Sequence, residues 1–283
     1  MEYKNGEPNG DSSHPDTYAE PRLSRRGLLG GSASLAGLAA LAASGAAAVP
    51  TAALPAGEGA GVGEHYVGAG RIIFSGPVDV PRVALSFDDG PHPELTPLVA
   101  RVLAEHDVSA TFFCVGEQVR RHPDIVVDLA AAGHDIGNHS WSHPRLPDLL
   151  PSEKLAQVER TQIEIEKVTG RTPTLFRPPY GQFDGYTARF CVQFGLDLAL
   201  WTGPRRLAGE LRPSTVAEHI DAHIEPGAIV LLHDGVTSAP VLGFASQLVN
   251  RQVEIAALGS CIEAVRARGL EFVTIAELLA AST

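Results

Sequence analysis

From Val83 onward the sequence alternates short apolar runs with longer stretches of helical periodicity. Seven runs have strand length, namely 83–87, 110–115, 134–138, 174–177, 197–201, 228–232 and 271–274. Helical spacing fills the intervals, most clearly over 95–106, 152–169, 214–224 and 250–268, and Gly133, Gly170 and Gly269 stand where helix C-caps belong. This alternation predicts a parallel sheet with helical crossovers. Because no Gly-x-Gly-x-x-Gly follows the first run, a closed or nearly closed β/α barrel is favoured over a dinucleotide-binding sheet.

The N-terminal 48 residues are predicted to be an export signal rather than part of the fold. Arg25 and Arg26 precede a stretch of Ala and Gly that runs without charge to Ala48, and the small residues at 46–48 offer a cleavage site. An uncleaved membrane anchor is the alternative, but the stretch is low in Leu, Ile and Phe, which favours cleavage. We expect 1–48 to be a twin-arginine-type signal, 49–79 a Gly/Ala-rich linker and 80–283 a single catalytic domain, with no stable membrane insertion after cleavage.

Charge and cysteine content narrow the possible partners. The 33 acidic residues against 22 Lys and Arg give a net charge of -11, which disfavours nucleic acid and fits a neutral substrate. The three cysteines, Cys114, Cys191 and Cys261, are far apart in apolar or helical stretches. We expect them to be buried thiols, since free cysteine behaves as a small core residue.

Ionisable residues follow four of the predicted strands. Asp88 and Asp89 follow 83–87, His139 follows 134–138, Arg177 closes 174–177, and His233 follows 228–232. Active sites in β/α barrels lie at the C-terminal ends of the strands, so these side chains are expected to meet at one mouth.

The same residues suggest a metal centre. Two adjacent carboxylates at 88 and 89 are unfavourable unless a cation or a proton lies between them. His139 and His143 are four apart, and with one carboxylate they provide the three-ligand open site of a catalytic zinc. Surface histidines that bond locally are the alternative for this pair.

A hydrolytic mechanism can be assembled from these groups. If one aspartate binds the metal, Asp88 is free to take a proton from the metal-bound water that acts as the nucleophile. In the turn that follows Arg177, Pro178 and Pro179 have no N–H, so the amide of Tyr180 is the first donor available to an oxyanion. His233 is placed to protonate the leaving amine. A plain salt bridge at the barrel rim is the alternative role for Arg177.

Over residues of about 80 to 280 the chain resembles the polysaccharide deacetylase family, carbohydrate esterase family four with its NodB homology domain. SFDDGP at 86–91, HSWSH at 139–143, RPPYG at 177–181 and LLHD at 231–234 are similar to four of its five motifs. The resemblance implies a distorted (β/α) barrel of about seven parallel strands and one divalent ion, zinc or a similar ion such as cobalt.

The resemblance also implies a role for each matched residue. Asp88 is the catalytic base and Asp89, His139 and His143 are the metal ligands. Arg177 orients the base, the Tyr180 amide lines the oxyanion hole, and His233 is the acid. The substrate pocket includes Leu231, with Trp201 and Pro178 beside it, and Trp141, Tyr180 and Trp201 are candidates to stack on sugar.

The fourth motif departs from the family. An Asp-Trp pair is expected after the strand that ends at Trp201, but TGPRRLAGEL stands at 202–211, with Glu210 as the nearest carboxylate. Without a carboxylate partner the His233 imidazolium would lose its charge more readily, so we expect His233 to be a less effective general acid and the optimum pH for cleaving amides to be lower.

Three functions remain open from the sequence. The first is removal of N-acetyl groups from N-acetylglucosamine in chitin-type oligomers or peptidoglycan by an exported, extracellular or wall-associated enzyme. The second is an O-acetyl xylan esterase, which the altered fourth motif makes more credible because an alkoxide needs less help to leave than an amine. The third is a non-catalytic glycan-binding relative.

Overall fold

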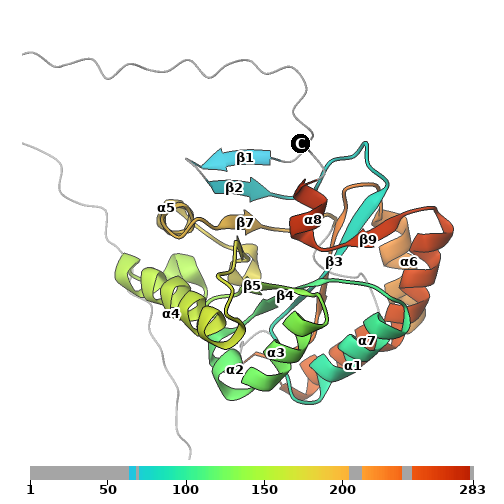
Figure 1. Ribbon diagram of the computed structural model, residues 1–283, viewed down its shortest axis with the longest axis horizontal. Helices are drawn as coiled ribbons and strands as arrows, with labels where there is room; N and C mark the ends of the chain where they lie inside the picture. The colour runs from blue at the N-terminus through green and yellow to red at the C-terminus, as the bar shows by residue number, and fades with distance from the viewer. Residues whose placement is uncertain (1–63, 68–69, 204–211, 238–243, 281–283) are drawn as a thin grey trace, which may run out of the picture. The chain divides into compact units, whose positions relative to one another are not determined.

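The computed structural model describes residues 64–67, 70–203, 212–237 and 244–280 (Figure 1). The predicted export signal at 1–48 lies outside the described residues. So does Glu210, the nearest carboxylate to the altered fourth motif. In the described part of the chain, no helix is long and apolar enough to cross a membrane.

A single curled sheet forms the centre of the fold. Its order is β1-β2-β7-β6-β5-β4-β3-β8, and β9 pairs with the start of β3. The strands are β1 (Glu64–Val67), β2 (Gly70–Ile73), β3 (Arg82–Asp88), β4 (Thr111–Cys114), β5 (Asp135–Asn138), β6 (Leu175–Phe176), β7 (Asp197–Ala199), β8 (Ile229–His233) and β9 (Glu271–Val273). Every described pairing is parallel except that of β1 with β2. The distorted parallel barrel is therefore confirmed, as an incomplete one.

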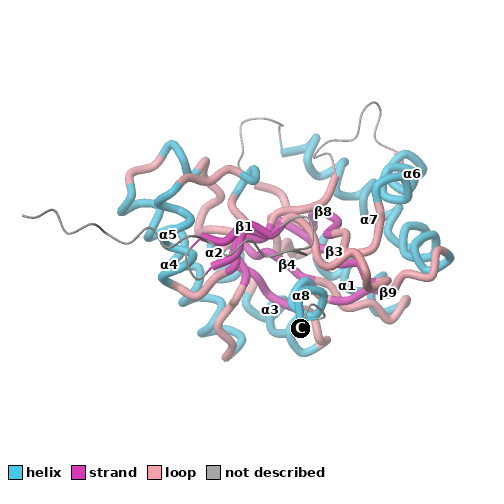
Figure 2. The backbone as a smooth tube through the Cα atoms, turned by 90° about the horizontal axis from the view of Figure 1, so that it is seen from above, coloured by secondary structure: helices cyan, strands magenta, loops and turns pink. Residues whose placement is uncertain are grey.

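Helices cover the outer face of this sheet (Figures 1 and 2). They are α1 (Leu95–Glu105), α2 (Gly116–Arg121), α3 (Pro123–Ala131), α4 (Pro151–Thr169), α5 (Gly185–Gln193), α6 (Pro213–His223) and α7 (Phe244–Ala267), while α8 (Ile275–Ala280) follows β9. Gly133, Gly170 and Gly269 all have positive φ just after α3, α4 and α7, as the C-cap prediction requires.

The alternation of side chains along β3 decides which residues face the site. Val83, Leu85 and Phe87 pack in the outer core with α1, α3, α6 and α7. Ala84 belongs to the second core cluster, which contains Phe113 and residues of α8. Because successive residues of a strand point to opposite faces, Ser86 and Asp88 lie on the same inner face as Ala84. The strand thus delivers a carboxylate to the inside of the curled sheet.

All seven predicted strands are present, but the N-terminal edge was not predicted. β1 and β2 lie within 49–79, the expected linker, and β2 pairs with β7 through Ile72 and Ile73. The linker boundary was therefore wrong for this stretch. Each of these strands has only four residues, too few to show a period.

The cysteines behave as the sequence predicted. Cys114, Cys191 and Cys261 are free and buried. Burial raises the pKa of Cys191 and Cys261 to about 12 and that of Cys114 well above its ordinary value. Such thiols are inert core residues.

Candidate active site

The loop that follows β3 brings two carboxylates and two histidines together. Asp88 and Asp89 are each 5% exposed and His139 is 1% exposed. One ligand atom from each of Asp89, His139 and His143 lies within 4.8 Å of the others. The nearest atoms are His143 Nε2 and Asp89 Oδ1, which are 3.2 Å apart. The sequence predicted this grouping, and the structure assembles it from the segments that follow β3 and β5.

The hydrogen bonding of His139 leaves its second ring nitrogen facing the two carboxylates. His139 Nδ1 lies 2.6 Å from the carbonyl oxygen of Arg177, which only accepts, so Nδ1 carries the proton and donates it. In the neutral ring, the lone pair of Nε2 then faces Asp88 Oδ2 at 3.7 Å and Asp89 Oδ1 at 3.6 Å. With the ring neutral, three electron-rich atoms converge, which is favourable only with a cation between them or a proton on Nε2. A histidine fixed through its second nitrogen is also the usual arrangement of a metal ligand.

The pKa values at this cluster follow from burial and from the neighbouring charges. Burial lowers the pKa of His139, but Asp88 and Asp89 outweigh it and the net pKa is raised. Burial lowers the pKa of His143 to about 4. Burial raises the pKa of Asp89, but the hydrogen bond with His139 and the charges of His143 and His233 hold it well below its usual range. Asp89 and His143 are therefore ready to bind a metal at neutral pH.

Backbone strain concentrates at the same place. Among the described residues, five non-glycine residues have positive φ, and four of them are Asp89, Ser140, His143 and Tyr180. Such conformations cost about 1 kcal/mol or more each and persist where the surrounding structure enforces them. Two of the three candidate metal ligands, Asp89 and His143, therefore have strained backbone themselves.

Arg177 is the largest fully buried side chain at the site, with 0% exposure. Its Nη1 donates to Asp88 Oδ1 and to Ser86 Oγ, each at 2.8 Å. The rest of the guanidinium donates to the carbonyls of Ala199 and Leu200, and Cζ lies 4.0 Å from the Phe113 ring centroid. Burial lowers the pKa of Arg177, opposed by Asp88. Arg177 thus holds Asp88 in one orientation and is not a plain salt bridge at the rim.

The predicted substrate residues surround this cluster. The Tyr180 ring lies edge-on to His143 with centroids 4.7 Å apart. Trp201 is half-buried, and its ring packs against the backbone of Gly181, where a Cβ would lie 2.7 Å from it. Leu231 on β8 is half-buried beside Ser86 of β3. Pro178 is buried between Arg177 and the turn.

Trp141 is the one aromatic candidate that does not face solvent. It is 5% exposed, and the guanidinium carbons of Arg120 and Arg160 lie 5.0 and 4.0 Å from its ring. A sugar therefore cannot stack on it without displacing an arginine, because Trp141 packs against α2 and α4.

His233, at the end of β8, has a carboxylate partner that the sequence did not predict. Glu254 Oε2 accepts from the His233 backbone N–H at 2.9 Å and lies 3.3 Å from His233 Nδ1. Arg251, one turn earlier on α7, contacts Glu254 Oε1 at 3.3 Å and Asp89 Oδ2 at 3.1 Å. The expectation of an unpartnered His233 was therefore wrong. The partner comes from α7, far along the sequence from the segment at 202–211.

Asp234, directly after β8, packs against the loop that follows β3. Thr96 donates to its Oδ2 at 2.6 Å, and a Cβ at Gly90 would lie 2.2 Å from the same oxygen. Burial raises the pKa of Asp234 to about 7. Only glycine fits at position 90, so this aspartate packs the β3 loop against β8.

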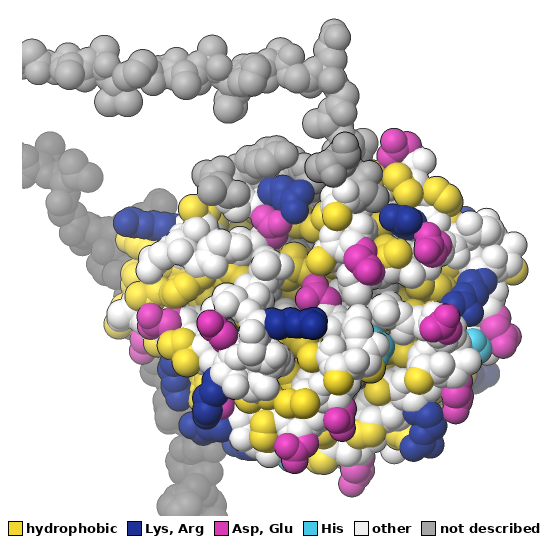
Figure 3. Space-filling view, in the orientation of Figure 1, with side chains coloured by type: hydrophobic (Ala, Val, Ile, Leu, Met, Phe, Trp, Pro, Cys, Tyr) yellow, Lys and Arg dark blue, Asp and Glu magenta, His cyan; other side chains and the backbone are white. Residues whose placement is uncertain are grey.

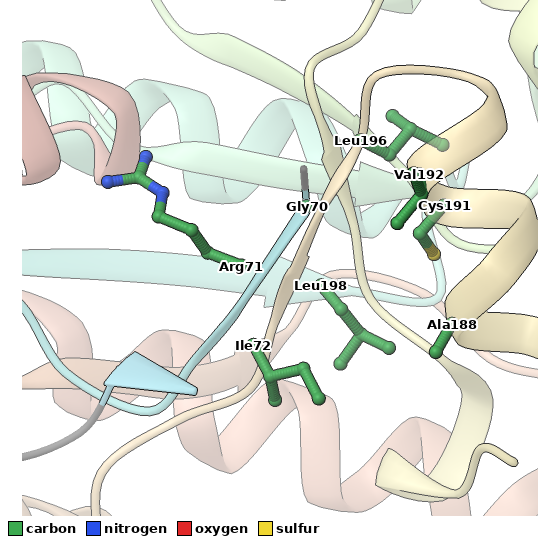
Figure 4. A pocket seen from close by; sticks show the side chains of 8 residues that line it. All are labelled: Gly70, Arg71, Ile72, Ala188, Cys191, Val192, Leu196 and Leu198. Carbon is green, nitrogen blue, oxygen red and sulfur yellow. The ribbon is translucent and has the colours of Figure 1, made fainter. Parts of the chain in front are cut away.

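Two other surface features carry no chemistry of this kind. A small apolar recess between β2, β7 and α5 is lined by Gly70, Ile72, Cys191, Val192 and Leu198, with Arg71 pointing away (Figure 4). None of the residues gathered around Asp88 lines it. The visible described face in Figure 3 carries acidic and basic side chains interspersed, without a field of one sign.

Comparisons with known proteins identify relatives of this chain. A family model described as polysaccharide deacetylase matches residues 75–199. A peptidoglycan-N-acetylglucosamine deacetylase of Bacillus cereus is 32% identical over 216 residues, which are 74% of this chain and 72% of that protein. A chitooligosaccharide deacetylase of Azorhizobium caulinodans is 34% identical over 189 residues, 66% of this chain and 89% of that protein.

A solved structure extends the likeness to three dimensions. It is a peptidoglycan N-acetylglucosamine deacetylase in complex with 4-naphthalen-1-yl-N-oxidanyl-benzamide. That structure is 30% identical, covers 73% of this chain and 91% of its own chain, and superposes with a TM-score of 0.66.

Proposed function

Because this chain belongs to the polysaccharide deacetylase family, we propose that it is a divalent-metal-dependent hydrolase that removes N-acetyl groups from polysaccharide containing N-acetylglucosamine. The observation that carries the proposal is the joint placement of two groups. The cluster of Asp89, His139 and His143 lies within 4.8 Å, and Asp88, held by Arg177 at 2.8 Å, stands beside it.

The donor set fits a divalent ion. Two neutral imidazoles and one carboxylate suit zinc, with cobalt as an alternative, and leave a position for water. An ion held by Asp89, His139 and His143 would make a water more acidic and polarise the acetyl carbonyl.

The chain's own residues supply the remaining chemistry. Asp88 accepts a proton from the attacking water while Arg177 keeps the carboxylate aimed at it. The Tyr180 amide donates to the oxyanion as the carbonyl carbon becomes tetrahedral. His233 gives a proton to the amine nitrogen as the carbon–nitrogen bond breaks, which leaves acetate and a free amino sugar.

The residues around the cluster support an acetylated sugar as the substrate. Leu231 and Pro178 are apolar and lie beside the cluster, where the acetyl methyl would sit, and Trp201 offers a ring for the sugar. The relatives named above act on peptidoglycan and chitooligosaccharides, and either polymer fits a neutral acetylated sugar.

We also propose that the protein is exported by its twin-arginine-type signal and acts outside the cell or at the wall. Arg25, Arg26 and the uncharged stretch to Ala48 support this proposal. Peptidoglycan and chitin-type polymers lie outside the cytoplasm, so export and substrate agree.

The O-acetyl xylan esterase remains the second candidate, since the same groups cleave an ester. Glu254 weakens the case for it, because the case rested on a His233 without a carboxylate. A non-catalytic glycan-binding role is disfavoured by Asp88. This carboxylate lies beside the metal cluster but is not one of its three ligands, so the role that explains its position is that of a base. Acetate release by the purified protein from chitin oligomers, peptidoglycan fragments and acetylated xylan separates the three. Release from xylan alone would favour the esterase, and no release from any of them would favour the binding protein.

A further inference from the structure

The partner of His233 is fixed on both of its oxygens. Glu254 Oε2 accepts the backbone N–H of His233 at 2.9 Å and faces the ring Nδ1 at 3.3 Å. Glu254 Oε1 faces Arg251 Nη1 at 3.3 Å. The side chains of Glu254 and Arg251 are each 12% exposed, whereas that of His233 is 25% exposed. The carboxylate is therefore set behind the ring, and the ring remains open to solvent.

Arg251 connects this pair to the metal cluster. Its Nη2 donates to Asp89 Oδ2 at 3.1 Å and its Nε donates to the carbonyl of Gly235 at 3.0 Å. Asp89 Oδ1 is the oxygen that faces His139 and His143. Arg251 thus occupies the second oxygen of the carboxylate and leaves the first for the ion.

The helix α7 places both residues by the same rule that builds its core face. Leu258, Cys261 and Val265 are buried in the outer core, and Glu254 stands four residues before Leu258. Residues three and four apart share a helix face, so Glu254 and Arg251 extend this buried stripe toward the N-terminus of α7. At that end of α7, Glu254 and Arg251 contact polar groups, namely His233 at the end of β8 and Asp89 after β3.

We propose that Glu254 is the positioning residue for the acid His233, in place of the carboxylate missing after Trp201, and that Arg251 locks it to the metal ligand Asp89. The inference rests on the proposed deacetylation. With Nδ1 donating to Glu254, Nε2 is the nitrogen left to protonate the leaving amine. The carboxylate also stabilises the positive charge that the ring must carry before it gives up the proton, as the aspartate of a catalytic triad does.

Charged groups from three elements face His233. Glu254 and Arg251 come from α7 and Asp89 from the end of β3, while His143 comes from the loop after β5. Arg251 contacts both Glu254 and Asp89, so one side chain links the partner of the acid to the metal cluster.

The decisive experiment compares two substrates that differ in the leaving group. Wild type, Glu254→Gln, Glu254→Asp and the control Glu263→Gln are loaded with zinc. Glu263 lies on the same helix and is exposed. Turnover is measured on an N-acetylglucosamine oligomer, whose amine must be protonated, and on 4-nitrophenyl acetate, whose phenolate leaves without help. Glutamine keeps the shape of glutamate and still accepts the His233 backbone N–H.

The expected result for Glu254→Gln is a fall of about 10- to 100-fold in kcat on the oligomer, with KM and the rate on the nitrophenyl ester changed less than about threefold. Glu254→Asp recovers part of the loss, and Glu263→Gln matches wild type. Equal losses on both substrates would show a merely structural role, and an unchanged oligomer rate would show no role. Either result overturns the proposal.

A second readout separates this inference from the proposed function. In the zinc-loaded, nitrogen-15-labelled protein, His233 should show a proton on Nδ1, assigned by its loss in His233→Asn and displaced in Glu254→Gln. If wild type does not cleave the oligomer, the proposed function fails while this resonance still tests Glu254. A His233 ring protonated on Nε2 alone would overturn the pairing.

Discussion

Arg177 Nη1 lies 2.8 Å from Asp88 Oδ1, and both side chains are buried on the inner face of the curled sheet. The guanidinium is positively charged, and Asp88 is the carboxylate it contacts. Its other donors are taken up by Ser86 and by the carbonyls of Ala199 and Leu200. One residue therefore fixes the proposed base and joins β3, β6 and the end of β7.

This arrangement predicts a large and specific loss of stability on removal of Arg177. Arg177→Met leaves Asp88 buried without its partner and should lower the free energy of unfolding by about 3–5 kcal/mol. Adding Asp88→Asn to it removes the unpaired charge and should restore part of the loss. Urea unfolding of the metal-free proteins, prepared with a chelator, measures the free energy of unfolding of both variants. A single-variant loss below about 1 kcal/mol would show that the pair is not a structural link.

Metal binding should release one proton below the pKa of His139. The pKa of His139 is raised, and below that pKa its Nε2 holds a proton that the ion must displace. The pKa of His143, lowered by burial to about 4, and that of Asp89, held well below its usual range, leave both already deprotonated.

Zinc affinity should therefore rise about tenfold per pH unit below the pKa of His139 and become flat above it. Calorimetry in two buffers with different heats of ionisation gives the number of protons released. A value of zero or two in the rising range would contradict the assignment of the proton to His139.

A second ion pair, Lys154 with Asp184, should control stability at acid pH. Lys154 is 3% exposed, and Asp184 also caps α5 by accepting from the Thr187 N–H. Burial raises the pKa of Asp184, but the hydrogen bonds from Lys154 and Thr187 and the charge of Lys154 together outweigh it, and the net pKa is lowered. A carboxyl group with a lowered folded pKa stabilises above its unfolded pKa of 3.8 and loses that contribution as the pH falls through the folded value.

Asp184→Asn keeps the cap and removes the charge, so it should cost about 1–3 kcal/mol at neutral pH. The difference from wild type should shrink below the unfolded pKa of 3.8. Asp148→Asn is the control, because its exposed pair with Arg145 should contribute less than about 1 kcal/mol. Thermal unfolding between neutral and acid pH measures both, and a difference that does not depend on pH would contradict the account.

The features that the sequence predicted share one property: they are set by local pattern. The seven strands were found from apolar runs, and Asp88, His139, Arg177 and His233 from their places after those runs. In a parallel sheet the C-terminal ends of all strands lie at the same edge, so residues that follow the strands in the sequence lie close together in space.

The features that were missed are set by packing between distant segments. β1 and β2 are too short to show a period, and β2 gains its place from β7. Arg251 and Glu254 lie on α7, a helix that the sequence predicted. The packing of α7 on the sheet decides which strand end these two residues contact, and the sequence pattern does not show that packing. One signal was present in the sequence: Arg251 and Glu254 have the helical spacing that continues through the apolar residues Leu258, Cys261 and Val265. Charged residues on the buried face of a helix indicate a polar partner.

The most direct test of the proposed hydrolase is acetate release from an N-acetylglucosamine oligomer while zinc is titrated into the chelated protein, beside Asp88→Asn. The account predicts no release without metal and a rise that ends at one zinc per chain. Asp88→Asn, in which Asn can still accept from Arg177, should bind the same single zinc but release acetate about 10²- to 10⁴-fold more slowly. Full-rate release from the metal-free protein or from Asp88→Asn would contradict it.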